Sequence, residues 1–284
     1  MKLTNTDIEQ WVRDYMAQPQ HNTMQALPGP AFDLPLVGFS RGDDPLYAYY
    51  RDHIDPAFYR LPETWLESVY GHPFEASHVS VISWVLPQTA ENRAKSREMT
   101  DCPTLEWQMV RVHGEECNRA LADALVAYLA TQGIEAVAPM TSDQFAWGDS
   151  ERFVKVSNWS ERHTAFISGL GTFGLCDGLI SAKGKAARYG SVIADLPLTP
   201  TPRPYTAYNE YCQAKNGCTA CIRRCPAGAI TPQGHDKLKC IAYHRSVIKQ
   251  VCHERYGYDG YAVCGLCQTG VPCESGIPGR REDT

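Results

Sequence analysis

The cysteines of this sequence are the residues best suited to distinctive chemistry. Nine of the 12 cysteines lie between Cys212 and Cys273 in a chain of 284 residues. Thiolates are ligands of soft metals, and a [4Fe–4S] cluster needs four of them. Eight of the nine divide into two sets of four, which predicts two such clusters. The first set is Cys212, Cys218, Cys221 and Cys273, and the second is Cys225, Cys240, Cys264 and Cys267.

The spacing of the first cysteines is close to that of bacterial ferredoxins. Those proteins carry C-x2-C-x2-C-x3-C-P, in which the cysteine before proline ligates the other cluster. Residues 218–226 (CTACIRRCP) match this run from its second cysteine onward. Lys215 stands where the first cysteine would be, and Cys212 lies three residues upstream. A longer loop can still reach a cluster corner, so we expect Cys212 to be a ligand.

A zinc site is the main alternative for these thiols. Zinc would take two C-x2-C pairs, here 218/221 and 264/267, and the remaining cysteines of both sets would have no role. Disulfides fit less well, because Met1 to Gln10 shows no export signal and thiols stay reduced in the cytoplasm. Cys102, Cys176 and Cys252 are interpreted as packed or free thiols, and no role follows for Cys117.

Composition narrows the class of protein further. Hydrophobic residues make up 43% of the chain, enough for a sizeable core, which excludes global disorder. The formal net charge is −5, so there is no overall basic character for nucleic acid. No apolar run reaches the ~18 residues of a membrane helix, so we expect no membrane partner and a cytoplasmic location.

Hydrophobic periodicity predicts the elements that would position the cysteines. Residues 6–9 (TDIE) read as a capping box that opens a helix to about Ala17. Strands are expected at 36–39, 78–86, 134–139 and 190–196, and helices at 105–132 and 161–168. Residues 88–103 are polar and are interpreted as a mobile excursion. The mixed order of elements favours an α/β (or α+β) fold in which helices cover a sheet.

The proline-rich stretch 199–204 (TPTPRP) is the clearest linker, and the composition changes after it to cysteine, glycine and short loops. We therefore expect an α/β domain over residues 1–200. A ferredoxin-like domain with two [4Fe–4S] clusters would follow over residues 201–284. About 200 residues are far more than a ferredoxin needs, so the first domain is expected to receive the electrons, through a flavin, a corrinoid or the substrate itself.

A short glycine-rich segment, residues 169–174 (GLGTFG), could approach a cofactor. It matches the G-x-G-x-x-G consensus of a dinucleotide-binding loop, but it follows a helical stretch instead of a strand. It could also be a simple glycine-rich turn. The third interpretation is a loop whose bare backbone lies against a flat cofactor.

Three stretches of the chain resemble the epoxyqueuosine reductase family and, more distantly, the reductive dehalogenases. They are residues 218–230 with 240–243 (CIAY), residues 264–268 (CGLCQ), and residues 168–198, in which GLGTFG, LIS and YGSVIADLPL follow the family's order. Together they cover most of residues 160–273. The cluster motifs are specific, whereas the glycine segment is specific only in combination with them.

The resemblance implies cobalamin as a further cofactor. Family members hold it base-off between the α/β domain and the nearer cluster, and reduce it through the two clusters for attack on an activated substrate. No D-x-H-x-x-G corrinoid motif is present, which fits binding without a protein histidine ligand. The cofactor-binding residues implied here are Gly169, Gly171, Thr172, Phe173 and Gly174. The implied partners are a small-molecule substrate and a small electron donor such as a ferredoxin or flavodoxin.

The resemblance also implies a proton donor, an aspartate shortly after a glycine at the start of the long helix. Glu116 falls at that position, in the stretch HGEECNR (113–119). A carboxylic acid beside an apolar corrin could have a raised pKa and deliver a proton. Alternatively, Glu116 is an ordinary glutamate of a helix surface.

Several features depart from the family. Leu175-Cys176 replaces a lysine after the last glycine, and the second cluster motif ends with five residues between Cys267 and Cys273 instead of three. The helical-repeat domain of longer members, which helps to hold tRNA, is not seen before Thr284, so tRNA binding is only weakly indicated. The pairs Arg223/Arg224 and Arg280/Arg281 are either solvated surface or a patch for an acidic electron donor. A two-cluster electron carrier and a corrinoid-handling protein remain alternatives to a reductase.

Overall fold

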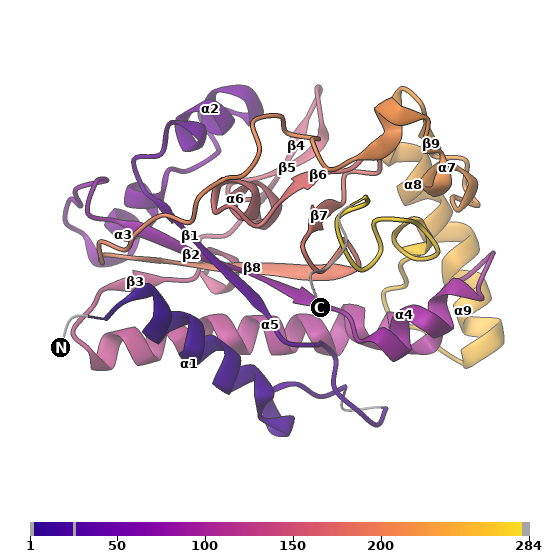
Figure 1. Ribbon diagram of the computed structural model, residues 1–284, viewed down its shortest axis with the longest axis horizontal. Helices are drawn as coiled ribbons and strands as arrows, with labels where there is room; N and C mark the ends of the chain where they lie inside the picture. The colour runs from indigo at the N-terminus through magenta and orange to yellow at the C-terminus, as the bar shows by residue number, and fades with distance from the viewer. Residues whose placement is uncertain (1–2, 25–26, 280–284) are drawn as a thin grey trace.

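The computed structural model describes residues 3–24 and 27–279, and its centre is a four-stranded antiparallel sheet (Figure 1). The strand order is β1-β2-β8-β3. The bounds are Leu36–Arg41 for β1, Ser80–Pro87 for β2, Ala187–Ala194 for β8 and Ala136–Val137 for β3. Strand β2 is buried along its whole length because it lies between β1 and β8 and both faces of the sheet are covered. The fold is therefore mixed α/β, as the element order predicts.

One face of the sheet packs against α1 (Asn5–Ala17) and the 27-residue α5 (Leu105–Thr131), which run along the lower side of Figure 1. Trp84 of β2 and Leu121 and Leu125 of α5 are fully buried in this layer. The capping box of α1 is formed by Thr4 and Asp7, so the helix begins two residues earlier than the sequence predicts. Helix α5 ends where Gly133 adopts a φ of 72°, a conformation that glycine accepts at no steric cost.

The opposite face packs against three shorter helices, and Trp65 and Trp159 are fully buried there. These helices are α2 (Pro45–Ile54), α3 (Pro62–Tyr70) and α6 (Glu161–Ile167). Two small hairpins that the sequence did not reveal flank α6. The first pairs β4 (Trp147–Ser150) with β5 (Val154–Ser157), and the second pairs β6 (Gly171–Phe173) with β7 (Leu179–Ser181).

Residues 88–103 contain an ordered helix, so the expectation of a mobile excursion is wrong. Helix α4 (Ala90–Arg97) begins at Thr89, whose side chain accepts from Asn92 N–H. Arg97 at its end forms an ion pair of 2.5 Å with the buried carboxylate of Glu274. The anchoring partner lies 177 residues away, which is why local composition did not reveal it.

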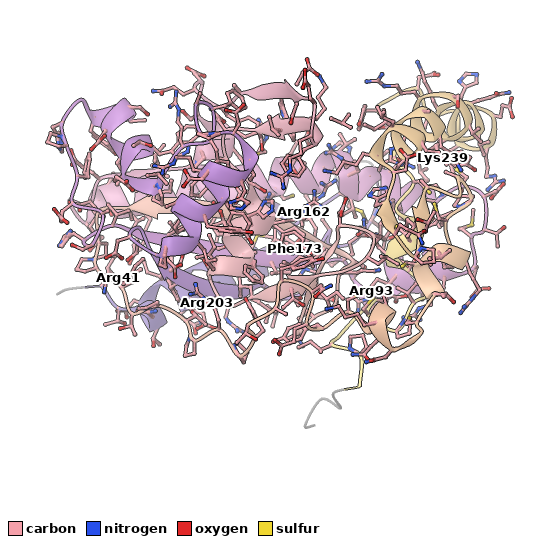
Figure 2. The ribbon with its side chains drawn as sticks, turned by 90° about the horizontal axis from the view of Figure 1, so that it is seen from above. Arg41, Arg93, Arg162, Phe173, Arg203 and Lys239 are labelled. Carbon is pink, nitrogen blue, oxygen red and sulfur yellow. The ribbon has the colours of Figure 1, made fainter. Side chains whose placement is uncertain are left out.

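After the 199–204 stretch the elements become short. They are α7 (Ala220–Arg223), β9 (Ile230–Thr231), β10 (Gly234–His235), α8 (Lys237–Tyr243) and α9 (Lys249–Tyr256), with a π-helical stretch at His244–Ile248. Single 3-10 turns occur at Pro19–His21, Pro139–Thr141, Gln213–Asn216 and Leu266–Gln268. The elements that follow residue 204 gather at one end of the sheet. Lys239 of α8 and Arg41 of β1 therefore lie at opposite ends of the molecule (Figure 2). In the described ranges, no helix is long and apolar enough to cross a bilayer.

Candidate functional site

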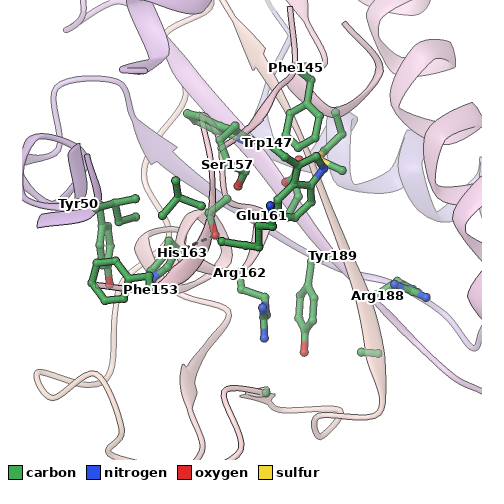
Figure 3. A pocket seen from close by; sticks show the side chains of 18 of the residues that line it. Tyr50, Phe145, Trp147, Phe153, Ser157, Glu161, Arg162, His163, Arg188 and Tyr189 are labelled. Atoms are coloured by element: carbon green, nitrogen blue, oxygen red, sulfur yellow. Dashed lines mark hydrogen bonds between the residues drawn. The ribbon is translucent and has the colours of Figure 1, made fainter. Parts of the chain in front are cut away.

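A cavity of about 940 Å³ opens between α2, the β4–β5 hairpin, α6, α5 and β8 (Figure 3). Its volume is at the upper end of the range for small-molecule and cofactor pockets. Gly178, Lys185 and Gln268 also line it, and Gln268 directly follows Cys267. The cavity therefore borders the cysteine-rich segment, although most of its wall belongs to the helices and strands before residue 200.

The lining of this cavity is strongly cationic. Two glutamates, Glu115 and Glu161, face seven basic side chains there, in a chain whose formal net charge is −5. The basic residues come from α5, the β4–β5 hairpin, α6 and β8 with the loop before it, and they are Arg111, Arg119, Arg152, Lys155, Arg162, Lys185 and Arg188. A site with this balance of charge attracts anions.

Arg188 of β8 is the basic side chain whose surroundings penalise its charge most clearly. Burial and the neighbouring guanidinium of Arg111 lower the pKa of Arg188 to about 10. Its nearest carboxylate atom belongs to Glu115, at 3.6 Å, and Arg119 shares that carboxylate at 3.9 Å. One glutamate thus partly neutralises two arginines, and positive charge is left over at this end of the cavity.

Aromatic side chains form another part of the wall. Tyr50, Phe145, Trp147 and Phe153 are among them, and Figure 3 shows Phe145 and Trp147 on the side away from Arg162 and Arg188. The Trp147 side chain is 68% exposed at the start of β4, at the end of the β4–β5 hairpin away from its turn, where a large apolar ring has little packing reason to be. Tyr189, which also lines the cavity, lies between Arg162 and Arg188 in the same view, so aromatic rings border the cationic part of the cavity as well.

His163 lies in the wall of the cavity and is uncharged at neutral pH. Burial lowers its pKa to about 3, because the charged imidazolium would lose its hydration. Its Nδ1 is 2.7 Å from the Ser160 hydroxyl, and its ring packs against Tyr50 and Phe173. It therefore contributes a neutral ring to the site.

Glu161, the first residue of α6, is the acidic group of the cavity with the most altered titration. Both of its carboxylate oxygens are buried and neither has a hydrogen-bond partner. Burial raises the pKa of Glu161 to about 8, and the nearby Ser191 hydroxyl opposes this only in part. The side chain therefore holds a proton at neutral pH, which the sequence did not suggest.

The structure brings three members of the first set of predicted cluster ligands near one another, and these are Cys212, Cys221 and Cys273. Cys273 interacts electrostatically with Cys212, and Cys221 interacts with Cys273. Cys218 follows the turn Gln213–Asn216, where its N–H donates to the Gln213 carbonyl at 3.0 Å. The upstream position of Cys212 is thus compatible with its role as a ligand, because the turn brings it toward Cys273.

The second set is also brought together. The thiol of Cys264 interacts with those of Cys225, Cys240 and Cys267. Burial acts against ionisation of Cys240, but hydrogen bonds with His235 and His244 lower its pKa to about 6. A thiol that ionises so readily is a good metal ligand.

Cys176 is a residue that the sequence treated as a packed thiol and that the structure places beside predicted cluster ligands. Its Sγ contacts the thiols of Cys221 and Cys267 and accepts from Lys185 Nζ at 3.2 Å. The ammonium of Lys185 is almost fully buried, and the sulfurs of Cys176 and Cys273 raise its pKa despite that burial. The replacement of the family's lysine by Leu175-Cys176 was the signal in the sequence.

Two of the other cysteines, Cys102 and Cys252, share a small buried cluster with Cys264 of the second set. Cys102 and Cys252 are fully buried with their sulfurs 3.4 Å apart, and Cys117 is buried on α5. Within the described ranges, no three histidine, cysteine or acidic side chains converge tightly enough to hold a single metal ion. An iron–sulfur cube makes a different demand, because each of its four thiolates binds a separate iron. Two groups of soft sulfur donors suit that demand.

The chain is similar in sequence to curated proteins of one name. No family model matches the chain. An epoxyqueuosine reductase of Leadbetterella byssophila is 36% identical over 112 residues, which are 38% of this chain and 35% of that protein. The enzyme of the same name from Bacillus cereus is 29% identical over 129 residues, which are 44% of this chain and 32% of that protein. The chain resembles epoxyqueuosine reductases.

Solved structures show that the likeness extends to the fold. An epoxyqueuosine reductase with an epoxyqueuosine-modified tRNA stem loop matches with a TM-score of 0.52 and 16% identity, over 97% of this chain and 67% of that one. A reductive dehalogenase described as B12-dependent matches with a TM-score of 0.52 and 19% identity, over 88% of this chain and 30% of that one. The predicted resemblance to the epoxyqueuosine reductase family is thus confirmed. The matched segments span only about a third of the curated relatives.

The residue implied as the epoxyqueuosine reductase proton donor lies outside the lining of the cavity. The Glu116 side chain is 57% exposed, and its carboxylate is 2.8 Å from His113 Nδ1. Its neighbour Glu115 and the distant Glu161 line the cavity instead. The role of Glu116 as proton donor stays a prediction. Glu115 and Glu161 are two other acids to consider for that role, because they line the cavity.

The glycine segment of the resemblance is occupied by contacts within the protein. A Cβ added to Gly171 would lie 2.2 Å from the Ile180 carbonyl oxygen, and one added to Gly169 would lie 2.8 Å from that of Pro202. Thr172 Oγ1 accepts from Tyr211 N–H at 2.9 Å. The pairing of β6 with β7 therefore explains Gly171, the contact with Pro202 explains Gly169, and Gly178 is the glycine that lines the cavity. A cofactor contact for Gly169, Gly171, Thr172, Phe173 and Gly174 stays a prediction.

The first arginine pair does not form a uniform surface patch. Arg223 is exposed, whereas the Arg224 guanidinium donates to the carbonyls of Met99 at 2.7 Å, Thr269 at 2.9 Å and Ser96 at 3.1 Å. Arg224 therefore joins the loop after α4 to the second cysteine motif. The pair Arg280/Arg281 lies outside the described residues.

Proposed function

We propose that this chain is an iron–sulfur oxidoreductase that passes single electrons through two [4Fe–4S] clusters to a cobalamin, for reduction of an activated organic substrate. The single observation that carries the proposal is the contact between the cavity and the thiol groups: Lys185 lines the cavity and also donates to Cys176 beside Cys221 and Cys267. The names of the relatives, epoxyqueuosine reductase and B12-dependent dehalogenase, favour the same chemistry.

Under this proposal, two ferredoxin-like sets of thiols would hold the clusters in a domain over residues 201–284. Cys212, Cys218, Cys221 and Cys273 would hold one cluster, and Cys225, Cys240, Cys264 and Cys267 the other. Bound clusters and cobalamin would supply one-electron transfer and a strong nucleophile, chemistry that no amino-acid side chain provides. The domain over residues 1–200 would bind cobalamin and substrate in the cavity.

The chain's own residues would bind the substrate, shield it and hold a proton. Residues of α2, α6 and the β4–β5 hairpin would contact the substrate in the cavity. The carboxyl group of Glu161 keeps its proton at neutral pH because it is buried. Glu116 at the exposed surface of α5 remains the proton donor that the family resemblance implies.

A small ferredoxin or flavodoxin in the cytoplasm would supply the electrons. A tRNA substrate is a weaker proposal: it is supported by the relative solved with a tRNA stem loop, whereas the net charge of −5 opposes it. A small molecule that fits the cavity is the substrate class that we favour.

Anaerobic purification tests the proposal. We expect about eight iron and about eight acid-labile sulfide per chain, because each of two cubes contains four of each. We also expect hydroxocobalamin to co-elute with the protein in gel filtration and to show a base-off spectrum. Tightly bound zinc without sulfide would contradict the cluster assignment. Full cluster content with no retention of cobalamin would instead indicate a two-cluster electron carrier.

A further inference from the structure

The helices after residue 236 expose basic side chains in an otherwise acidic protein. Residues 205–279 contain eight lysines and arginines and five aspartates and glutamates, whereas residues 1–204 contain 17 and 25. We propose that the exposed face of these helices is the docking surface for a small acidic protein that carries one electron at a time. This inference rests on the proposed function, because it takes the thiols beside this face to hold the cluster that receives the electron. It adds the surface at which such a carrier would bind.

The surface lies on one helical stretch, formed by α8, the π-helical segment and α9. Figure 2 shows Lys239 of this stretch at the end of the molecule opposite Arg41. Ile248 and Cys252 are fully buried on its inner side. Its exposed residues form what we call the α8–α9 face, and they include Leu238, Lys239, Arg245, Val247 and Lys249.

The basic side chains of the α8–α9 face have no acidic partner within the protein. Among residues 3–24 and 27–279, the ion pairs of this helical stretch are those of His253 and Arg255, which follow the basic part. The charges of Lys239, Arg245 and Lys249 therefore remain available to another molecule. A local field of one sign steers an oppositely charged protein toward it and raises the rate of association.

The α8–α9 face borders the second set of predicted cluster ligands. Lys239 directly precedes Cys240, and its Nζ donates to the Gly228 carbonyl at 3.1 Å. The Gly228 N–H in turn donates to the Cys225 carbonyl at 3.0 Å. Cys225 and Cys240 are half-buried, whereas Cys264 is buried. A carrier on this face would thus lie beside Cys225 and Cys240. Its reduced centre would lose one electron to the cluster of the second set, and no bond would form or break.

Two aliphatic side chains stand among these charges. Leu238 is 63% exposed and Val247 is 39% exposed. Their burial against a partner would be favourable, and protein–protein interfaces combine apolar contacts with a polar rim. Complexes that transfer electrons are typically small and weak, so a face of this extent is sufficient. A nucleic acid would use the basic side chains through its phosphates but would gain little from Leu238 and Val247.

Calorimetric titration of the cluster-loaded protein with an acidic plant-type [2Fe–2S] ferredoxin tests the inference. Both proteins are kept oxidised, so that binding is measured without turnover. The Debye length falls from about 30 Å at 0.01 M to about 8 Å at 0.15 M ionic strength, and we expect the affinity to fall at least about tenfold over this range. The formal net charge of −5 by itself would repel an acidic partner, and salt would then strengthen binding. An affinity that is constant or rises with salt would overturn the inference.

Charge-reversal variants locate the surface. Arg245→Glu with Lys249→Glu should weaken ferredoxin binding at low ionic strength at least about tenfold. Arg13→Glu with Arg41→Glu changes the net charge equally, on α1 and at the opposite end of the molecule, and should have a much smaller effect. Equal weakening by the two double variants would overturn the inference, because net charge alone would explain it. If the first variant loses iron, Arg245→Gln with Lys249→Gln replaces it, with a smaller expected loss of affinity and the same control.

Competition with unfractionated tRNA separates a protein partner from a nucleic acid. Displacement of ferredoxin by tRNA that binds the wild-type protein but not the Arg245→Glu/Lys249→Glu variant would assign the α8–α9 face to nucleic acid and overturn the inference. Equal binding of tRNA by both proteins, without displacement of ferredoxin, would support the carrier.

Iron and sulfide analysis before the titration separates this inference from the proposed function. A protein with about eight iron and eight sulfide that does not bind ferredoxin would refute the docking surface and leave the proposed function standing. A protein without sulfide that still binds ferredoxin through Arg245 and Lys249 would refute the proposed function and leave the docking surface standing.

Discussion

The sheet region before residue 200 and the C-terminal segment 205–279 are stabilised in different ways. The twelve largest fully buried side chains of the described residues, Trp65, Trp84 and Trp159 among them, all belong to the sheet region. The C-terminal segment has two small buried clusters, in which cysteine side chains are prominent. Apolar burial can account for the first region, whereas the second contains little of it and relies on long-range polar contacts and, under the proposed function, on bound clusters.

Polar contacts join the C-terminal segment to the rest of the molecule. Arg224 donates to the carbonyls of Ser96 and Met99, and Glu274 pairs with Arg97. The Lys185 and Ala186 N–H groups donate to the carbonyls of Cys273 and Glu274 at 3.0 and 3.3 Å. These contacts align the last cysteines with β8, so the positions of the thiol groups and of the cavity wall depend on the same set of hydrogen bonds and ion pairs.

Removal of iron should have the largest effect on this comparison. Chelation under anaerobic conditions should make residues 205–279 sensitive to proteases while the sheet region stays resistant, since binding of a structural metal contributes directly to folding. Cys221→Ala should retain about four of eight iron atoms per chain. Limited proteolysis with mass spectrometry and iron analysis measure both effects.

Cys117→Ala is the matched control for that experiment, because Cys117 belongs to the sheet region and is buried on α5. It should keep full iron content. Protection of residues 205–279 that survives complete loss of iron would show that the segment folds without clusters.

Loss of the hydrogen bonds that Arg224 donates should have an intermediate effect. Arg224→Met leaves the carbonyls of Ser96, Met99 and Thr269 without their donor, which should lower the free energy of unfolding by about 2–4 kcal/mol. Chemical denaturation of the cluster-loaded protein measures this change. Arg223→Met is the control, since its exposed side chain should contribute less than about 0.5 kcal/mol. Equal effects of the two variants would show that the hydrogen bonds of Arg224 do not stabilise the attachment of the C-terminal segment.

An effect of similar size concerns Glu161 in the sheet region. Its folded-state pKa of about 8 lies above the ordinary value of 4.5, so the folded state binds more protons than the unfolded chain between these values. Stability should therefore fall as the pH rises from about 5 to about 8, by an amount on the order of a few kcal/mol. Glu161→Gln should flatten this slope, as measured by denaturation at several pH values. An unchanged slope in the variant would assign the titration to another group.

Local sequence patterns revealed much of the scaffold. The apolar run of β2, the long periodic helix α5 and its terminal glycine were predicted within one or two residues, because their signals lie within the elements themselves. The α4 segment was misjudged because Arg97 and Ser96 find their partners in Glu274 and Arg224, far along the chain. Polar composition alone cannot distinguish a mobile loop from a helix that a distant residue anchors.

The residues of the candidate site fall into the same two groups, those with a local sequence signal and those that depend on distant partners. The sequence by itself determined that the last quarter of the chain is rich in thiols with the spacing of cluster ligands, because such ligands sit on short loops and their spacing is local. Only the tertiary structure placed Cys176 and Lys185 beside those thiols, buried Glu161, and directed Arg111, Arg162 and Arg188 toward one cavity. The physical reason is that burial and electrostatic interaction depend on distance in space, and these side chains come from elements that the sequence keeps far apart.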